Sequence, residues 1–185
     1  MTKSNIFRKE VRFSGSGGQG LILAGIILAK AAALEGYKVT QTQSYGPESR
    51  GGSSRADVVI SNSEIYFPEA QHFDYLVALT QQAADKYIFD LKEDGLLIID
   101  TGTVKNLGMT ISNLIEDELS EICLERLGSV LPMNIVSLSC LVRISGLVTE
   151  KNLELAIRDS LKPALIDLNL KAMKLGFEIA DKSKN

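Results

Sequence analysis

The feature that most constrains this chain is the glycine-rich segment at residues 13–20, which reads FSGSGGQG. It ends a short apolar segment and opens a long one that continues to residue 35. Gly15, Gly17 and Gly20 have the spacing G-x-G-x-x-G. Because glycine has no Cβ, backbone N–H groups in such a turn can approach a phosphate, and the N-terminus of a following helix adds partial positive charge. The segment therefore predicts a strand, a phosphate-binding turn and a helix in succession.

Two common kinds of nucleotide site do not fit this turn. A Walker-type phosphate loop has a lysine where this chain has Leu21. A Rossmann site for NAD has an acidic residue at the end of the second strand, and the segment VTQTQ at 39–43 contains none. We therefore expect the turn to bind a phosphate or a polar ligand edge, but neither NAD nor ATP.

The remaining pattern predicts an α/β fold. We expect strands at 11–15, 38–43, 56–61, 73–80 and 95–100, and helices at 20–35 and 81–91. After residue 100 the pattern favours helices at 116–127, 133–147, 150–161 and 164–181. Apolar strands that alternate with helices indicate a sheet covered on both faces. The prediction is a single three-layer domain, residues 1–185, with a mostly parallel sheet and a helical C-terminal half.

The helix expected at 20–35 is apolar around its whole circumference, although a helix that rests on one sheet face normally keeps a polar side. Either other helices of this chain or a partner subunit must cover it. Its apolar stretch is shorter than the ~20 residues that span a bilayer, and the apolar segment 133–148 contains Arg143. Residues 1–9 lack a secretory signal. We expect a cytoplasmic protein that does not enter a membrane.

The composition excludes several classes of function. A net charge of -3 and a pI near 5.3 give no electrostatic footprint for nucleic acid. Cys123 and Cys140 lie far apart without a C-x-x-C pair, so we expect no zinc, iron–sulfur or other metal site held by this chain alone. In a chain of cytosolic character we expect them to be buried thiols, with a disulfide as the alternative. His72 is a lone histidine and is expected to be structural. Ser14 stands where a nucleophile elbow around Ser16 requires glycine, so we expect no catalytic residue in this chain.

A second loop, residues 44–55, follows the second predicted strand and reads SYGPESRGGSSR. Loops that leave the carboxyl ends of parallel strands line the ligand crevice of an α/β sheet, so this loop and the glycine turn should face one crevice. Arg50 offers a permanent cation with a bidentate fork, and Gly51-Gly52 allows close backbone approach. A plain surface turn with a solvated arginine stays open as the alternative.

Taken together and in this order, the two loops resemble the gamma subunit of 2-oxoacid:ferredoxin oxidoreductases. The resemblance rests on GGQG at 17–20, SYGPESRGG at 44–52 and VVIS at 58–61. It continues through Pro68, Asp74, Gly95, Asp100 and Asn134 to NLKAMKLG at 169–176. It covers nearly the whole chain, as a single gamma-type domain.

The resemblance implies a multi-subunit enzyme that decarboxylates a 2-oxoacid, reduces ferredoxin and transfers the acyl group to coenzyme A. Thiamine diphosphate, magnesium and iron–sulfur clusters are then expected on the alpha, beta and ferredoxin-like partner subunits. This chain would pack against the catalytic subunits and help bind coenzyme A. By position, Gly17, Gly18 and Gln19 would contact coenzyme A, and Ser49 and Arg50 would meet its phosphates or fix the loop against a partner.

Substrate choice follows from the resemblance alone. Pyruvate-type gamma chains tend to read FGPERRG at the second loop, whereas this chain reads YGPESRG and has Ser16 before GGQG. It looks more like the 2-oxoglutarate type. The pyruvate, 2-oxoisovalerate and indolepyruvate enzymes stay open as alternatives, and so does a stand-alone module that binds a nucleotide-like ligand.

Overall fold

The computed structural model describes residues 7–45 and 53–183, and within them one sheet has six strands in the order β2-β3-β1-β4-β5-β6. The strands are β1 (Arg8–Ser16), β2 (Lys38–Tyr45), β3 (Ser53–Ser61), β4 (Phe73–Ala78), β5 (Leu91–Asp100) and β6 (Asn113–Asp117). β1, β4, β5 and β6 pair in parallel, and β3 alone runs antiparallel to its neighbours β1 and β2. The mostly parallel sheet predicted from the sequence is confirmed.

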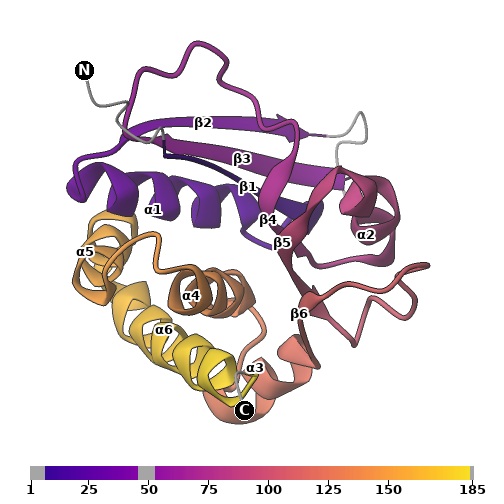
Figure 1. Ribbon diagram of the computed structural model, residues 1–185. Helices are drawn as coiled ribbons and strands as arrows, with labels where there is room; N and C mark the ends of the chain where they lie inside the picture. The colour runs from indigo at the N-terminus through magenta and orange to yellow at the C-terminus, as the bar shows by residue number, and fades with distance from the viewer. Residues whose placement is uncertain (1–6, 46–52, 184–185) are drawn as a thin grey trace.

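Helices cover both faces of this sheet. They are α1 (Leu21–Leu34), α2 (Gln81–Tyr87), the 3-10 turn η1 (Ile88–Asp90), α3 (Leu119–Leu127), α4 (Met133–Ser145), α5 (Glu150–Ser160) and α6 (Pro163–Ser183). Figure 1 shows α1, α4, α5 and α6 together on one side of the sheet, with α2 apart from them. Two apolar clusters match this division, since one joins the sheet to α1 and α3–α6 and the other joins it to α2. The three-layer arrangement and the helical C-terminal half are therefore also as predicted.

Other helices of this chain cover the outer side of α1. α5 and α4 pack against it, and Ala24, Ile27, Leu28 and Ala31 are fully buried. Polar contacts at its C-terminal end fix α5, because Glu35 Oε1 accepts hydrogen bonds from both the backbone N–H and the hydroxyl of Thr149 at 2.7 Å. Of the two explanations for this apolar helix, the one that needs no partner subunit accounts for most of its surface.

Several boundaries differ from the sequence prediction. β1 and β3 each begin three residues earlier than predicted, at Arg8 and Ser53, and three further differences follow. β4 ends at Ala78 because Thr80 caps α2, its side chain accepting a hydrogen bond from the backbone N–H of Ala83. β5 begins at Leu91, so the helix predicted to reach that residue stops earlier. Residues 113–117 form the edge strand β6, although the sequence predicted a helix from Glu116. In β6 only Ile115 is buried, so its sequence carries little of the apolar signal of a strand.

An ion pair lies inside the apolar layer on the α2 side of the sheet. Arg12 on β1 and Asp57 on β3 are register partners, 4% and 1% exposed, and form two hydrogen bonds of 2.6 Å each. The guanidinium also lies between the rings of Phe73 and Tyr87, 4.2 and 4.5 Å from their centroids. Because both ions are paired and the cation is stacked, this charge can be tolerated in the core.

Candidate functional site at the carboxyl edge of the sheet

The glycine turn follows β1 and leads directly into α1. Gly17 and Gly18 are exposed, and Gly18 and Gly20 have φ values of 93° and 73°. Such left-handed conformations favour glycine because they crowd a Cβ. Gly20 caps α1 without a side-chain hydrogen bond, and the first turn of the helix contains no acidic residue. An exposed turn before a long helix, with no side-chain hydrogen bond at the cap, is the geometry that the sequence predicted for an anion site.

Gln19 holds the turn in shape. Its Oε1 accepts a hydrogen bond from the backbone N–H of Ser16 at 2.7 Å, and its Nε2 donates to the carbonyl of Leu79 at 3.2 Å. A Cβ on Gly15 would overlap the same Oε1 atom, so glycine at 15 makes room for this amide. The amide that the sequence assigned to ligand contacts is thus already engaged with the backbone. Contact between Gln19 and a ligand through its backbone stays a prediction.

Asn134 joins α4 to this turn. It is 4% exposed and donates from Nδ2 to the carbonyl of Gly20 at 2.9 Å, across 114 residues of sequence. The start of α1 is therefore fixed to the start of α4. The sequence carried only a weak signal for this role, namely an asparagine at the beginning of a strongly apolar helix.

The two loops singled out in the sequence do start from one edge. Ser16 at the end of β1 pairs in register with Ser53, and Tyr45 at the end of β2 pairs with Ser54. The last described residue of β2, Tyr45, and the first of β3, Ser53, therefore lie at the same sheet edge as the glycine turn. Ser49 and Arg50 lie outside the described residues, so their predicted role stays a prediction.

A cavity of about 240 Å³ opens beside the turn at the same edge. Its lining comprises Gly18, Gln19, Asp100, Thr103, Ser120, Val130, Leu131 and Met133. These residues place the N-terminal ends of α1, α3 and α4 around it. Thr103 ties the loop after β5 to the end of β4, since its hydroxyl is 3.1 Å from the carbonyl of Leu79, the group that also binds Gln19.

Asp100 is the buried acid of this cavity. It ends β5 and is 0% exposed. Its Oδ1 accepts hydrogen bonds from the backbone N–H groups of Gly102 at 3.1 Å and Ser120 at 3.4 Å. Its Oδ2 has no hydrogen-bond partner among the described residues. Apart from its place in the motif order of the resemblance, nothing in the sequence singles out this acid, because the burial of its Oδ2 depends on the loops that follow β5.

The cysteines are structural. Both are buried free thiols, as the sequence predicted. Burial, with a smaller contribution from the charge of Asp100, raises the pKa of Cys123 to about 11, and burial raises the pKa of Cys140 still further. At neutral pH neither is a thiolate, the form that binds metals. Within residues 7–45 and 53–183, no group of three or more His, Cys, Asp or Glu side chains could hold a metal ion.

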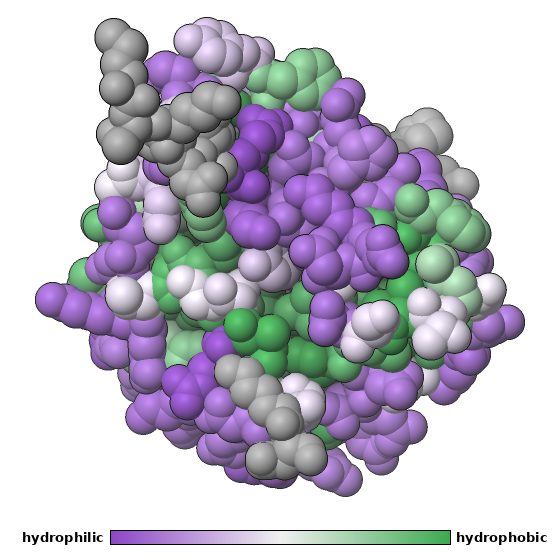
Figure 2. All heavy atoms as spheres, in the orientation of Figure 1, coloured by the Kyte–Doolittle hydropathy of each residue, from purple (hydrophilic) through white to green (hydrophobic). Residues whose placement is uncertain are grey.

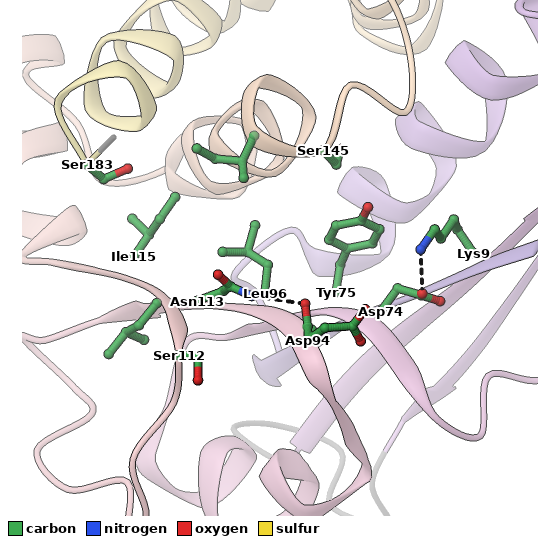
Figure 3. A pocket seen from close by; sticks show the side chains of 13 residues that line it. Lys9, Asp74, Tyr75, Asp94, Leu96, Ser112, Asn113, Ile115, Ser145 and Ser183 are labelled. Atoms are coloured by element: carbon green, nitrogen blue, oxygen red, sulfur yellow. Dashed lines mark hydrogen bonds and ion pairs between the residues drawn. The ribbon is translucent and has the colours of Figure 1, made fainter. Parts of the chain in front are cut away.

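A larger cavity, about 430 Å³, lies at the opposite, amino edge of the sheet (Figure 3). Apolar side chains gather in the hollow across this face (Figure 2), and the lining includes Leu96, Ile115 and Ile144. Two of its charged residues, Lys9 and Asp74, pair with each other at 2.8 Å, and Lys92 contacts the same carboxylate at 2.8 Å. Ligands of parallel α/β sheets bind beyond the carboxyl ends of the strands, so the smaller cavity is the better functional candidate.

None of the described helices is both long enough and apolar enough to cross a lipid bilayer.

Comparison with known proteins agrees with this architecture. Residues 10–179 match the family described as pyruvate ferredoxin/flavodoxin oxidoreductase. The chain is 43% identical to 2-oxoglutarate synthase subunit KorC of Methanocaldococcus jannaschii over 176 residues, which cover 94% of each chain.

Two solved structures share the fold. The gamma subunit of a keto/oxoacid ferredoxin oxidoreductase from Geobacter sulfurreducens superposes with a TM-score of 0.86 at 40% identity, covering 95% of this chain and 98% of that one. A 2-oxoglutarate:ferredoxin oxidoreductase from Magnetococcus marinus, solved with 2-oxoglutarate, coenzyme A and succinyl-CoA bound, has a TM-score of 0.83. At 22% identity it shows the fold alone, over 95% of this chain and 31% of that one. The chain belongs to the pyruvate ferredoxin/flavodoxin oxidoreductase family, as a subunit of a 2-oxoacid:ferredoxin oxidoreductase.

Proposed function

We propose that this chain is the gamma subunit of an enzyme that converts 2-oxoglutarate and coenzyme A to succinyl-CoA and CO2 while reducing ferredoxin. The choice of 2-oxoglutarate is supported by the 2-oxoglutarate synthase subunit to which the chain is 43% identical along nearly its full length. Partner alpha, beta and ferredoxin-like subunits would hold thiamine diphosphate, magnesium and iron–sulfur clusters. Thiamine diphosphate supplies the decarboxylation chemistry when it is bound there.

The contribution of this chain would be to bind coenzyme A at the glycine turn. The observation that carries this proposal is the N-terminus of α1, which has no side-chain cap and has Gly17 and Gly18 exposed in front of it. Backbone N–H groups and the helix dipole can stabilise a phosphate at this position. Gln19 and Asn134 would keep the turn in the shape that a phosphate needs, through the contacts at 2.7 and 2.9 Å described above. The Magnetococcus enzyme, which shares the fold, was solved with coenzyme A bound.

Gly17→Val tests the turn. The added side chain stands where a phosphate would approach, so the KM for coenzyme A should rise in the reconstituted complex while the KM for 2-oxoglutarate stays the same. Ala33→Val is the matched control, because it adds a similar side chain at an exposed position near the far end of α1. An unchanged coenzyme A constant in Gly17→Val contradicts binding at the turn.

Arg50 tests the second loop. If its guanidinium meets a phosphate of coenzyme A, Arg50→Ala should weaken coenzyme A by about 1.5–3 kcal/mol, the usual range for a hydrogen bond to a charged group. Arg50→Lys should lose less, because it keeps the charge without the bidentate fork. If Arg50 instead fixes the loop against a partner, both variants should loosen subunit assembly and leave the coenzyme A constant alone.

The substrate is tested by supplying the reconstituted complex with competing 2-oxoacids. Preference for 2-oxoglutarate over pyruvate, 2-oxoisovalerate and indolepyruvate supports the proposal, and preference for any of the others replaces it. Co-purification from native cells separates a subunit from a stand-alone binding module, since a module would be recovered without the thiamine-diphosphate subunits.

A further inference from the structure

The cavity beside the glycine turn contains a buried acidic residue, although it lies next to the position proposed for a negatively charged phosphate. Its acid, Asp100, is fully buried, and Oδ2 has no hydrogen-bond partner among the described residues. A buried polar atom without a partner is costly, and such atoms in a folded protein need an explanation. The surrounding N-terminal ends of α1, α3 and α4 help to stabilise the negative charge, but they leave this one acceptor unfilled.

A hydrogen-bond donor with an apolar body would complement this cavity. Oδ1 already receives the backbone N–H groups of Gly102 and Ser120, so only Oδ2 has an acceptor position left. The outer wall is apolar and accessible, since Val130 and Leu131 are 46% and 75% exposed. A phosphate is disfavoured here, because its charge would face a carboxylate in a partly dehydrated site.

Gly18 and Gln19 belong to both the turn and the cavity. A ligand whose phosphate rests on the turn therefore has its next atoms at the mouth of the cavity. In coenzyme A the group that follows the phosphates is the pantetheine arm, which carries a hydroxyl, a pair of methyl groups and amide N–H groups. Its methyl groups suit Val130 and Leu131, and its hydroxyl and amides are the donors that Oδ2 lacks.

We propose that this cavity binds the pantetheine arm of coenzyme A, with Asp100 Oδ2 accepting a hydrogen bond from its hydroxyl or an amide, and that Asp100 keeps the phosphates out. This assignment rests on the proposed function, because it presumes that coenzyme A binds at the glycine turn. It adds an orientation: the phosphates lie over the turn, beside the carboxyl ends of β1 and β2. The arm points toward the C-terminal end of β5 and the N-terminal end of α3.

Asp100→Asn is the sharpest variant. The retained Oδ1 can still accept the N–H groups of Gly102 and Ser120, while an NH2 group replaces Oδ2 and turns an acceptor into a donor. Two halves of coenzyme A serve as competitive inhibitors of the reconstituted complex: S-methyl-pantetheine and adenosine 3′,5′-bisphosphate. Asp100→Asn should weaken coenzyme A and S-methyl-pantetheine by about tenfold or more, and should change adenosine 3′,5′-bisphosphate by less than roughly twofold.

Two further variants guard this test. Asp117→Asn is the matched control, because Asp117 ends the neighbouring strand β6 in register with Asp100 and does not line the cavity. Asp117→Asn should leave the inhibition constants of both inhibitors unchanged. Leu131→Ser covers the case in which Asp100→Asn does not fold. Leu131 is exposed and lies at the rim, so its loss should weaken S-methyl-pantetheine selectively while thermal stability is kept.

Several outcomes would overturn the assignment. If Asp100→Asn weakens the binding of both inhibitors equally, or of neither, the pantetheine arm does not contact Asp100. Tighter binding of the nucleotide half to Asp100→Asn would place phosphates in the cavity. If Asp100→Asn weakens subunit assembly and leaves both inhibition constants unchanged, Oδ2 instead pairs with a cationic side chain of a partner subunit. In each of these cases coenzyme A still binds, so the proposed function survives. If the Gly17→Val complex has the same KM for coenzyme A as the wild-type complex, both proposals are wrong.

Discussion

Arg12 and Asp57 show what a charged residue requires inside this fold. Asp57→Ala would leave the guanidinium buried between Phe73 and Tyr87 with no carboxylate to pair with, so we expect it to lower the free energy of unfolding by about 3–5 kcal/mol. Urea denaturation at neutral pH measures the loss. Asp159→Ala is the control, because Asp159 pairs with Lys30 on the surface, where its side chain is 74% exposed, and should cost less than about 1 kcal/mol. Similar losses in the two variants would contradict this account.

The residues of the glycine turn show what could and could not be predicted at this scale. The glycine spacing predicted the turn, since it depends on local backbone freedom alone. The partners of Gln19 and Asn134 are Leu79 and Gly20, 60 and 114 residues away, and the unpartnered oxygen of Asp100 results from the packing of three separate helices. Such roles are set by tertiary structure, so residue types in sequence order could not reveal them.

Helices α4 and α6 pack so closely at Gly176 that the addition of a single methyl group tests their contact. A Cβ on Gly176 of α6 would overlap the carbonyl of Val136 in α4 and lie 2.7 Å from the Cβ of Ser139. Helix propensity alone would make Gly176→Ala stabilising by about 1 kcal/mol. We expect the opposite sign, a loss of about 1–3 kcal/mol, because the helices must move apart. Lys174→Ala, at an exposed position of α6, should stay within about 0.5 kcal/mol of wild type. Thermal denaturation of both variants decides the sign.

Strands β1, β4 and β5 are joined at their amino ends by one carboxylate. Burial alone would raise the pKa of Asp74, but hydrogen bonds from Lys9 and Lys92 outweigh it and hold that pKa below its ordinary value of 3.8. A lowered pKa in the folded state means that the carboxylate stabilises the fold above about pH 4 and that this contribution disappears as the pH falls through the folded pKa. Unfolding of Asp74→Asn should therefore depend less steeply on pH between about 4 and 2 than unfolding of the wild type. Parallel pH profiles would contradict the assignment.

Weak burial explains why the sequence did not reveal the edge strand β6. The strands and helices with a continuous apolar face, such as β3 and α6, lie close to where the pattern predicted them. β6 lies at the edge of the sheet and buries a single side chain, and acidic residues follow it into α3. A strand that buries so little has no clear periodicity, so only its pairing with β5 identifies it.

At the scale of the whole molecule, the described surface keeps apolar side chains where partner subunits could pack. Leu34 of α1, Leu155 of α5 and Leu165 of α6 are 54%, 45% and 45% exposed. Leu34 belongs to the apolar first helix, for which the sequence left a partner subunit open as one of two covers, and the other two leucines extend the exposed apolar surface to the C-terminal helices. Singly exposed leucines are common in monomers, so the partner surface itself stays a prediction.

The chain should not oxidise a 2-oxoacid by itself. Its sequence has two cysteines, fewer than the four that a typical iron–sulfur cluster requires, and both are buried with raised pKa values. The purified chain, supplied with 2-oxoglutarate, coenzyme A, thiamine diphosphate, magnesium and a dye acceptor, should therefore give no turnover and no iron–sulfur absorbance. Adding the remaining subunits should restore activity in proportion to the complex formed. The physical reason is that electrons released by decarboxylation need a path to the acceptor, and the only sulfur ligands of this chain lie in its core as neutral thiols. Turnover by the single chain, free of the other subunits by mass spectrometry, would show that it has a catalytic site of its own.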